Sequence, residues 1–398
     1  MVAEDIDVKY EDAIKRCKPS FRSKLEHSVT LLRKAEGLAK MYDNEDGFFL
    51  AFSGGKDSQA LYHVTKMAGV LFKGHFSPTS VDPPDLVRFI KNEYPSVEWG
   101  HLDFSIYQRA VERRILPTMR VRWCCADFKE TAGAGKVTLI GIRKEESARR
   151  AKRHEVEVSN KKFSGSLDEF EDWSKAEIER KTKRKTKRKI NEDEFSVKSD
   201  SEVHCINGKD SILISPIFDW TEKDIWYFLN DIIKAPHCKL YDEGYKRIGC
   251  ILCPMSSPKS KQRDIERFPH VKRNWIKAIK EIRSGGVFKE GFIWWNIPRD
   301  WMQQTLQRGK CLGQHITSRK LPLHLCKTTM GQQTRNTSLR QERCSGFSES
   351  PASGGVDAGQ WTEDEIAEAI FDWWISGKPY KQWYSDKYLQ QKIEFDTE

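Results

Sequence analysis

A short run of small and charged residues, Ser53-Gly54-Gly55-Lys56-Asp57-Ser58, carries the strongest chemical signal in this sequence. Its two glycines let the backbone turn tightly and present several N–H groups, and its serines add hydroxyl donors. The run follows an apolar stretch typical of a strand and precedes a segment typical of a helix, whose positive N-terminal end would attract an anion. We therefore predict a cradle for a phosphate or sulfate. The alternative is a simple glycine turn capped by Asp57.

A second signal is the spacing of the cysteines. The chain has ten, and four of them form two close pairs, Cys124 with Cys125 and Cys250 with Cys253. In a reducing compartment a disulfide framework is not expected, and adjacent thiols do not readily bond to each other. Four thiolates instead supply enough soft ligands for an iron–sulfur cluster or for zinc. Cys238, which follows His237, could replace one ligand, and four buried free thiols are the alternative without a metal.

Two further polar residues follow predicted strands, Asp82 after the second and Arg143 after the fourth. A guanidinium at the position of Arg143 could grip a phosphate or sulfate through two hydrogen bonds. The alternative is a surface salt bridge with Glu145 or Glu146. Asp82 could hold a ribose hydroxyl or a magnesium ion, or it could cap the helix that follows.

The elements that must position these residues alternate between strand and helix. Apolar runs predict strands at 47–52, 70–76, 97–102, 137–142 and 212–217. Helices are predicted at 20–43, 58–67, 82–94, 262–282 and from a cap at Thr221 to residue 230. This alternation predicts an α/β fold, a Rossmann-like, doubly wound, mainly parallel sheet with helices on both faces. Ligands of such sheets bind at the carboxyl ends of the strands.

Composition and the glycine run divide the chain into an N-terminal helical segment at 1–44, a central domain at 45–285 that carries this run and a C-terminal extension at 286–398. Residues 160–202 contain 12 basic and 11 acidic residues, including the block RKTKRKTKRK at 180–189. They predict a solvated insertion that forms a charged helix. Within the extension, residues 317–360 are rich in Ser, Gln, Thr and Gly and predict a linker, and the aromatic residues of 361–398 predict a small helical cap.

Composition and charge exclude some classes of protein. With 38% hydrophobic residues, 13 Trp and 20 Phe, the chain can build a sizeable core. Its apolar runs are too short to cross a bilayer, and its acidic start is not that of a signal peptide, so we expect a cytoplasmic protein without a membrane partner. The net charge of +10 favours acidic ligands. Because residues 160–202 are almost neutral, we tie this excess to Lys56, Arg122, Lys129 and Arg143.

The glycine run resembles the PP-loop of the adenine nucleotide alpha hydrolase superfamily. Four later segments are similar to its phosphoadenosine phosphosulfate (PAPS) reductase branch. They are Trp123-Cys124-Cys125 followed by Lys129, Gly141 to Ser147, Pro216 to Thr221, and Leu240 to Tyr245 leading into Gly249 to Cys253. The resemblance spans about residues 45 to 260 and implies the adenine nucleotide alpha hydrolase-like fold. It also implies an adenine nucleotide, either ATP with Mg²⁺ or PAPS/APS, bound at Ser53, Gly54, Gly55, Lys56, Asp57, Ser58, Asp82 and Arg143.

The resemblance further implies a metal centre. Adenylyl-sulfate reductases of this family hold a [4Fe–4S] cluster with a tandem cysteine pair and a C-x2-C. On this basis the ligands are Cys124, Cys125, Cys250 and Cys253, with zinc as the alternative metal. The long interval between the two pairs is explained by the charged insertion.

The chain departs from the reductases at its C-terminal end. Those enzymes carry a nucleophilic cysteine in a Glu-Cys-Gly-Leu/Ile-His motif, which this sequence lacks. The nearest approach is Cys311, preceded by Lys310 and followed by His315, while Cys344 lies in a Ser-rich stretch. No catalytic residue is therefore assigned.

Two forms of sulfur chemistry follow as hypotheses. In the first, an oxidoreductase reduces an adenylylated sulfate through attack by a thiol. In the second, an ATP pyrophosphatase adenylylates an acceptor, and the iron–sulfur cluster helps to deliver sulfur. The intact loop and the missing reductase motif favour the second. Either form would need a protein partner or an electron or sulfur donor.

Hypotheses of another class concern nucleic acid. The chain could serve DNA or RNA modification, as in the phosphorothioation proteins that resemble this family. The basic block and the aromatic, basic C-terminus would then contact nucleic acid. A solvated helix neutralised by its acidic flanks is the alternative for the block. A catalytically inactive sensor is disfavoured by the intact loop.

Overall fold

A computed structural model describes residues 2–159, 162–191, 204–206, 209–284, 362–378 and 382–383. It divides into two compact units, residues 1–275 and 276–398. Each unit is described by itself below, and the domain boundaries given above stay predictions. In the described ranges, no helix combines the length and apolar character that crossing a bilayer requires.

The first unit is built around a seven-stranded sheet with strand order β3-β2-β1-β4-β7-β5-β6. Its strands are β1 (Phe48–Ala51), β2 (Phe72–Phe76), β3 (Glu98–Trp99), β4 (Val137–Leu139), β5 (Val156–Val158), β6 (Phe163–Gly165) and β7 (Ile212–Ile214). The pairs β3–β2, β2–β1, β1–β4 and β4–β7 are parallel. The chain order reverses between β1 and β4, which makes the carboxyl ends of these two strands the place where such a sheet binds ligands. The mainly parallel α/β fold is thereby confirmed.

Helices precede, connect and follow the parallel strands. They are α1 (Tyr10–Arg16), α2 (Pro19–Tyr42), α3 (Lys56–Ala68), α4 (Pro84–Glu93), α5 (Ile106–Arg113), α8 (Glu222–Tyr227), α9 (Pro258–Arg267) and α10 (Pro269–Ile282). Helix α2 packs on α3 and inserts Phe21 against Trp220, whose rings lie 4.7 Å apart edge to face. The indole Nε1 of Trp220 donates to Ser28 Oγ of α2 at 3.0 Å. The apolar face predicted for residues 20–43 therefore covers the core.

The structure also shows elements that periodicity did not predict. Strands β5 and β6 form an antiparallel pair beside β7, so residues 163–165 of the charged insertion belong to the sheet. The helix predicted at 262–282 is two helices, because a proline at 269 disfavours helical geometry in Phe268 before it. The cap predicted at Thr221 is confirmed, since its hydroxyl accepts from the N–H of Asp224.

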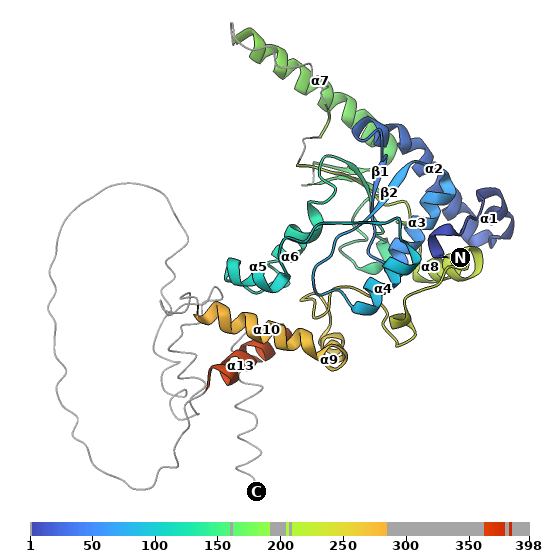
Figure 1. Cartoon of the computed structure of the whole chain (residues 1–398). Coiled ribbons are helices and arrows are strands. Elements are labelled where there is room, and N and C mark those ends of the chain that lie inside the picture. The colour runs from blue at the N-terminus through green and yellow to red at the C-terminus, as the bar shows by residue number, and fades with distance from the viewer. Residues whose placement is uncertain are drawn as a thin grey trace, which may run out of the picture. The chain divides into compact units, whose positions relative to one another are not determined.

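The charged insertion forms helix α7 (Leu167–Asn191), which extends away from the sheet (Figure 1). Its first turn is anchored by the buried side chains of Leu167 and Phe170. Lys181 donates to the backbone carbonyls of His204 and Cys205. The helix is therefore held at its beginning and middle, as far as its side chains are described.

The second unit contains α13 (Glu363–Ser376), which begins at a capping box on Thr362 and ends at Gly377 in the left-handed region. Arg283 pairs with Glu363 at 2.8 Å. A helix within the predicted cap is thus observed. The predicted linker at 317–360 lies outside the described residues.

The buried carboxylate of Asp85 links α4 to two later segments of the chain through ion pairs. Its carboxylate is 3% exposed and contacts Arg88 of α4, Lys239 of a following 3₁₀ turn (Lys239–Tyr241) and Arg267 of α9. Burial alone would raise the pKa of Asp85, but hydrogen bonds from Lys239 and Arg88 outweigh it and hold the pKa below its usual range. We expect Asp85→Asn to lower the free energy of unfolding at pH 7 by about 1 to 3 kcal/mol.

The pH dependence follows from the lowered pKa. The stabilisation is present above the unfolded pKa, about 3.9, and is lost as pH falls through the lower folded value. Urea titrations of wild type and Asp85→Asn should therefore differ at pH 7 and converge below about pH 4. The exposed Asp103→Asn should match wild type throughout. A difference for Asp85→Asn that does not shrink at low pH would contradict the role given to its charge.

Candidate functional site

The glycine run forms the turn between β1 and α3. Ser53 N donates to Ser58 Oγ at 3.2 Å, and Ser58 Oγ donates to the carbonyl of Gly55 at 2.9 Å, which closes the turn on itself. Gly54 has a φ of +70°, and a Cβ there would lie 2.6 Å from Cγ1 of Ile90 in α4. Only glycine fits this position without strain. The turn places the N-terminus of α3 at the carboxyl edge of the sheet, as the sequence predicts.

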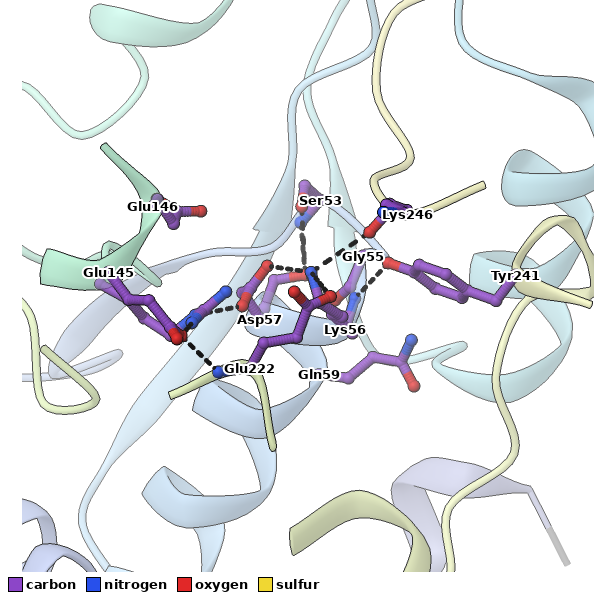
Figure 2. A network of polar contacts seen from close by, with 12 residues as sticks. Ser53, Gly55, Lys56, Asp57, Gln59, Glu145, Glu146, Glu222, Tyr241 and Lys246 are labelled. Carbon is purple, nitrogen blue, oxygen red and sulfur yellow. Dashed lines mark hydrogen bonds and ion pairs between the residues drawn. The ribbon is translucent and has the colours of Figure 1, made fainter. Parts of the chain in front are cut away.

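Lys56 is buried at the first position of α3, with 3% of the residue exposed. Its Nζ lies 3.2 Å from Oδ2 of Asp57, 3.5 Å from the carbonyl of Lys246 and 3.9 Å from Oε1 of Glu222 (Figure 2). A buried ammonium needs such partners, since leaving it unpaired would cost several kcal/mol. The loop therefore holds a fixed positive charge next to two carboxylates.

Arg143 lies just beyond β4 and supports the same loop. Its Nε donates to Asp57 Oδ1 at 2.6 Å, and its Nη1 donates to Glu145 Oε2 at 3.0 Å. Gly141 packs directly on the loop, because a Cβ there would lie 3.2 Å from the carbonyl oxygen of Asp57. The salt bridge with Glu145 is thus observed. Contact of Arg143 with a bound anion stays a prediction.

More arginines gather around this edge of the sheet. Desolvation, together with the neighbouring charges of Arg247 and Arg153, lowers the pKa of Arg150 to about 10. Arg150 pairs with Glu146, and Arg153 pairs with Glu157. A bound anion would relieve the repulsion among these guanidinium groups.

Tyr241 closes the loop from the other side. Lys56 N donates to Tyr241 Oη at 2.8 Å, and burial raises the pKa of Tyr241, which keeps its hydroxyl protonated. Neither Tyr241 nor Glu222 was given a role from the sequence. The signals available were the cap at Thr221, which places Glu222 in the first turn of α8, and the segment Leu240 to Tyr245, which contains Tyr241 and resembles the family. Their contacts depend on tertiary structure, which neither residue type nor spacing reveals.

The two predicted cysteine pairs come from distant parts of the chain but lie in the same region of the first unit, since Lys129, four residues after Cys125, contacts Cys250. Cys124 and Cys125 lie on a short helical turn, α6 (Trp123–Cys125), and the thiol of Cys124 is affected electrostatically by Cys250 and Cys253. All four thiols are free and partly buried. Cys238 is 1% exposed, and no influence of these four thiols on it is found.

Cations surround the four thiols. Arg122 Nη2 lies 3.2 Å from Cys125 Sγ, and Lys129 Nζ lies 3.3 Å from Cys250 Sγ. The hydrogen bond from Cys124, with help from Arg122, lowers the pKa of Cys125 to about 5. Desolvation opposes the charge on Lys129, but Cys250 and Asp82 outweigh it and raise the pKa of that ammonium. The surroundings therefore favour the thiolate of Cys125, whereas the hydrogen bond to Cys125 raises the pKa of Cys124 and burial raises the pKa of Cys253.

This donor set suits a group ligated by thiolates, because it offers four soft sulfur ligands and two cations lie beside two of the sulfurs. No three Cys, His, Asp or Glu side chains in the described ranges converge as the ligands of a single metal ion would. The fit consequently rests on the chemistry of the donors.

Asp82 follows β2 and lies near Lys129, the lysine that contacts Cys250. Its Oδ2 accepts from Thr79 N at 2.6 Å, and its charge acts on Lys129. It does not cap α4, whose N-cap is Pro83, so that alternative is not observed. The cysteines considered as nucleophiles, Cys311 and Cys344, lie outside the described residues, as do Lys310 and His315.

Comparison with known proteins places these residues within one domain. The family model described as phosphoadenosine phosphosulfate reductase domain matches residues 47–256. An uncharacterized protein of Methanocaldococcus jannaschii is 24% identical over 296 residues, which are 68% of this chain and 52% of that protein. The chain thus spans about half the length of this curated relative.

Two further matches are more limited. Adenosine 5'-phosphosulfate reductase 2 of Bacillus subtilis is 38% identical over 47 residues, 12% of this chain and 20% of that enzyme. The crystal structure of Candida glabrata FMN adenylyltransferase aligns with a TM-score of 0.35 and 15% sequence identity, over 66% of this chain and 78% of that chain. The match to the family model spans the loop, Asp82, Arg143 and all four paired cysteines.

Proposed function

The chain belongs to the phosphoadenosine phosphosulfate reductase family, and on that premise we propose that it is an enzyme acting on an adenine nucleotide. In its specific form, the proposal is an ATP pyrophosphatase. ATP binds with Mg²⁺ at the loop 53–58, an acceptor is adenylylated, and sulfur chemistry follows at the cysteines.

One observation carries this proposal. A single short segment, 241–253, contacts the loop at one end and provides two thiols at the other. Tyr241 and Lys246 touch Lys56, and Cys250 follows only a few residues later. A nucleotide on the loop would therefore lie beside the sulfur ligands.

The charges of the loop suit the cleavage of ATP. An acceptor oxygen would attack the α-phosphorus, the bond to the β-phosphate would break, and pyrophosphate would leave. Lys56, the N-terminus of α3 and Arg143 would stabilise the negative charge that develops. Magnesium is usually held by one or two carboxylates and the phosphates themselves, and Asp57 and Glu222 beside Lys56 supply such carboxylates.

The cysteines Cys124, Cys125, Cys250 and Cys253 would hold a [4Fe–4S] cluster, with zinc as the rival metal. When bound, the cluster would supply electrons or a sulfur-binding site beside the nucleotide. Arg122 and Lys129, which lie beside Cys125 and Cys250, would offset the negative charge of the thiolates.

The proposal is tested by measuring two products with anaerobic protein. Pyrophosphate release from ATP, dependent on Mg²⁺ and on an added sulfur donor or acceptor, supports the pyrophosphatase. Sulfite release from PAPS or APS without pyrophosphate release from ATP would overturn it in favour of reduction. Binding of neither nucleotide would overturn the family-based function as a whole.

Nucleic acid as the acceptor is the second candidate, and helix α7 favours it. Glu177 pairs with Arg180, and Glu179 pairs with Lys183. From residue 180 to the end of the helix at 191 the sequence has no acidic residue, and its eight basic residues follow one another closely. Such a helix can contact a phosphate backbone.

Three substitutions test this candidate. Replacing Lys185, Lys187 and Lys189 with Gln should weaken binding of both RNA and DNA duplexes. The slope of log affinity against log salt should fall by about 1 per lost phosphate contact. A control with Gln at Lys15, Lys34 and Lys40 should keep the wild-type slope. Equal slopes for the two triple variants, or no binding by wild type, would remove the candidate.

A further inference from the structure

A chain of three buried polar side chains leads from the core to the glycine turn. Gln59 and Tyr94 are 0% exposed and His63 is 2% exposed. They lie on α3 and just after α4, and the proposed chemistry uses none of them. Buried polar groups of this kind are costly unless each is satisfied, so their placement requires a reason.

The direction of the hydrogen bonds in this chain can be assigned. Gln59 Nε2 donates to the carbonyl of Gly54 at 3.1 Å, which leaves Gln59 Oε1 to accept from Tyr94 Oη at 3.3 Å. Tyr94 Oη, 3.1 Å from His63 Nε2, then accepts from that nitrogen. Burial lowers the pKa of His63 to about 3, so the imidazole is neutral at pH 7, and the bond to Tyr94 requires the tautomer with its proton on Nε2.

This chain fixes one peptide unit of the turn. In a trans peptide the C=O and the following N–H point in opposite directions. Because the carbonyl of Gly54 is held toward buried Gln59, the N–H of Gly55 must point away from the core. Within the described part of the chain, no acceptor is found for that N–H, whereas the next one, of Lys56, meets Tyr241.

An anchor is needed because the turn is flexible. Two consecutive glycines can rotate their shared peptide at little steric cost. If this peptide flipped, the carbonyl oxygen of Gly54 would face the anion site in place of an N–H. The repulsion would be greatest for the ligand with most negative charge.

We propose that Gln59, held by Tyr94 and His63, is a positioning residue that orients the Gly54–Gly55 peptide so that the N–H of Gly55 meets a phosphate of the nucleotide. The inference rests on the proposed function of the loop and adds to it three residues outside the glycine motif. Their effect is specific to the phosphates and does not extend to the nucleoside.

Gln59→Met tests this directly, since it keeps most of the volume and removes both hydrogen-bonding groups. We expect the Kd for ATP and for inorganic pyrophosphate to rise about tenfold, the value of one hydrogen bond to a charged group. The Kd for adenosine should stay at the wild-type value. Thr65→Val is the matched control, because Thr65 is equally buried on α3 but its hydroxyl bonds only to Leu61 O of its own helix.

A second readout does not depend on ligand. In protein labelled with ¹⁵N-glycine, the amide resonance of Gly55, identified with Gly55→Ala, should move in Gln59→Met and stay in place in Thr65→Val. Should Gln59→Met fail to fold, Tyr94→Phe removes the middle link and should give the same pattern with a smaller, about threefold, rise in Kd.

These measurements distinguish a failure of the function proposed for the loop from a failure of the role proposed for Gln59. Wild-type protein that does not bind pyrophosphate or ATP would overturn the function proposed for the loop. Wild-type binding that Gln59→Met retains in full would overturn only the role of Gln59. A parallel loss of adenosine and pyrophosphate binding in Gln59→Met would also overturn it, because it would indicate a general loss of structure.

Discussion

Lys56→Met is expected to slow pyrophosphate release from ATP by about 10²- to 10³-fold, the usual result of removing one fixed donor from a site of developing charge. Methionine keeps the length of the side chain but has no ammonium. Lys56 is positioned for this task because it is nearly inaccessible to solvent, so its charge is poorly screened and acts strongly on a phosphate at the turn. Steady-state release of pyrophosphate at saturating Mg²⁺ and ATP is the measurement.

The fold should survive this change. Asp57 keeps its 2.6 Å contact with Arg143, and Glu222 is about half exposed and can be solvated. The matched control is Lys66→Met on the same helix, since Lys66 contacts the backbone of Glu4 away from the loop. Wild-type rates in Lys56→Met, together with a normal thermal unfolding transition, would show that the loop does not bind the reacting phosphates.

The position of Lys56 could be predicted because local signals agree. A strand, two glycines and a helix start fall in succession at 48–58, and such a turn has one stable place, at the carboxyl edge of a parallel sheet. The side chains around Lys56 could not be predicted in the same way. Glu222 reaches it from a helix that follows the last parallel strand, and Tyr241 from a segment after that. Contacts between such distant residues leave no periodic trace in the sequence.

The contrast between local signals and distant contacts also explains which strands were predicted and which were missed. Short apolar runs marked β1, β4 and β7, because most residues of these strands are buried. Strands β5 (Val-Glu-Val) and β6 (Phe-Ser-Gly) have only three residues each and border a charged segment, so their periodicity is too short to mark them. Phe163 and Phe170 nevertheless pack edge to face at 5.4 Å, so aromatic residues were the signal that this part of the insertion is anchored.

Gln59 is a residue whose role could not be predicted from either its type or its position. Its type and position, one residue after the glycine run, resemble any polar residue at a helix start. Its role is visible only when its burial and its bond to Gly54 are known together. Sequence patterns report which residues face the core, and a buried polar residue is the exception that they miss.

Cys250→Ala is expected to abolish the metal centre. Anaerobically prepared wild-type protein should contain about four irons per chain and absorb visible light, as a [4Fe–4S] cluster held by four thiolates does. The variant lacks one of the four, at the position where Lys129 and Thr79 also contact the sulfur. We expect its iron content to fall below about one per chain and its colour to be lost.

Cys238→Ala provides the matched control and decides between two ligand sets. Its thiol is more deeply buried than Cys250, and burial raises its pKa, which disfavours the thiolate that a metal needs. What distinguishes the four paired cysteines is that Arg122 and Lys129 lie beside two of their sulfurs, those of Cys125 and Cys250. Cys238→Ala should therefore retain full iron content and colour. Loss of iron from Cys238→Ala would show that Cys238 is a ligand in place of one of the four assigned cysteines. A colourless wild-type protein with one zinc per chain would overturn the cluster itself, because thiolates beside cations also suit zinc.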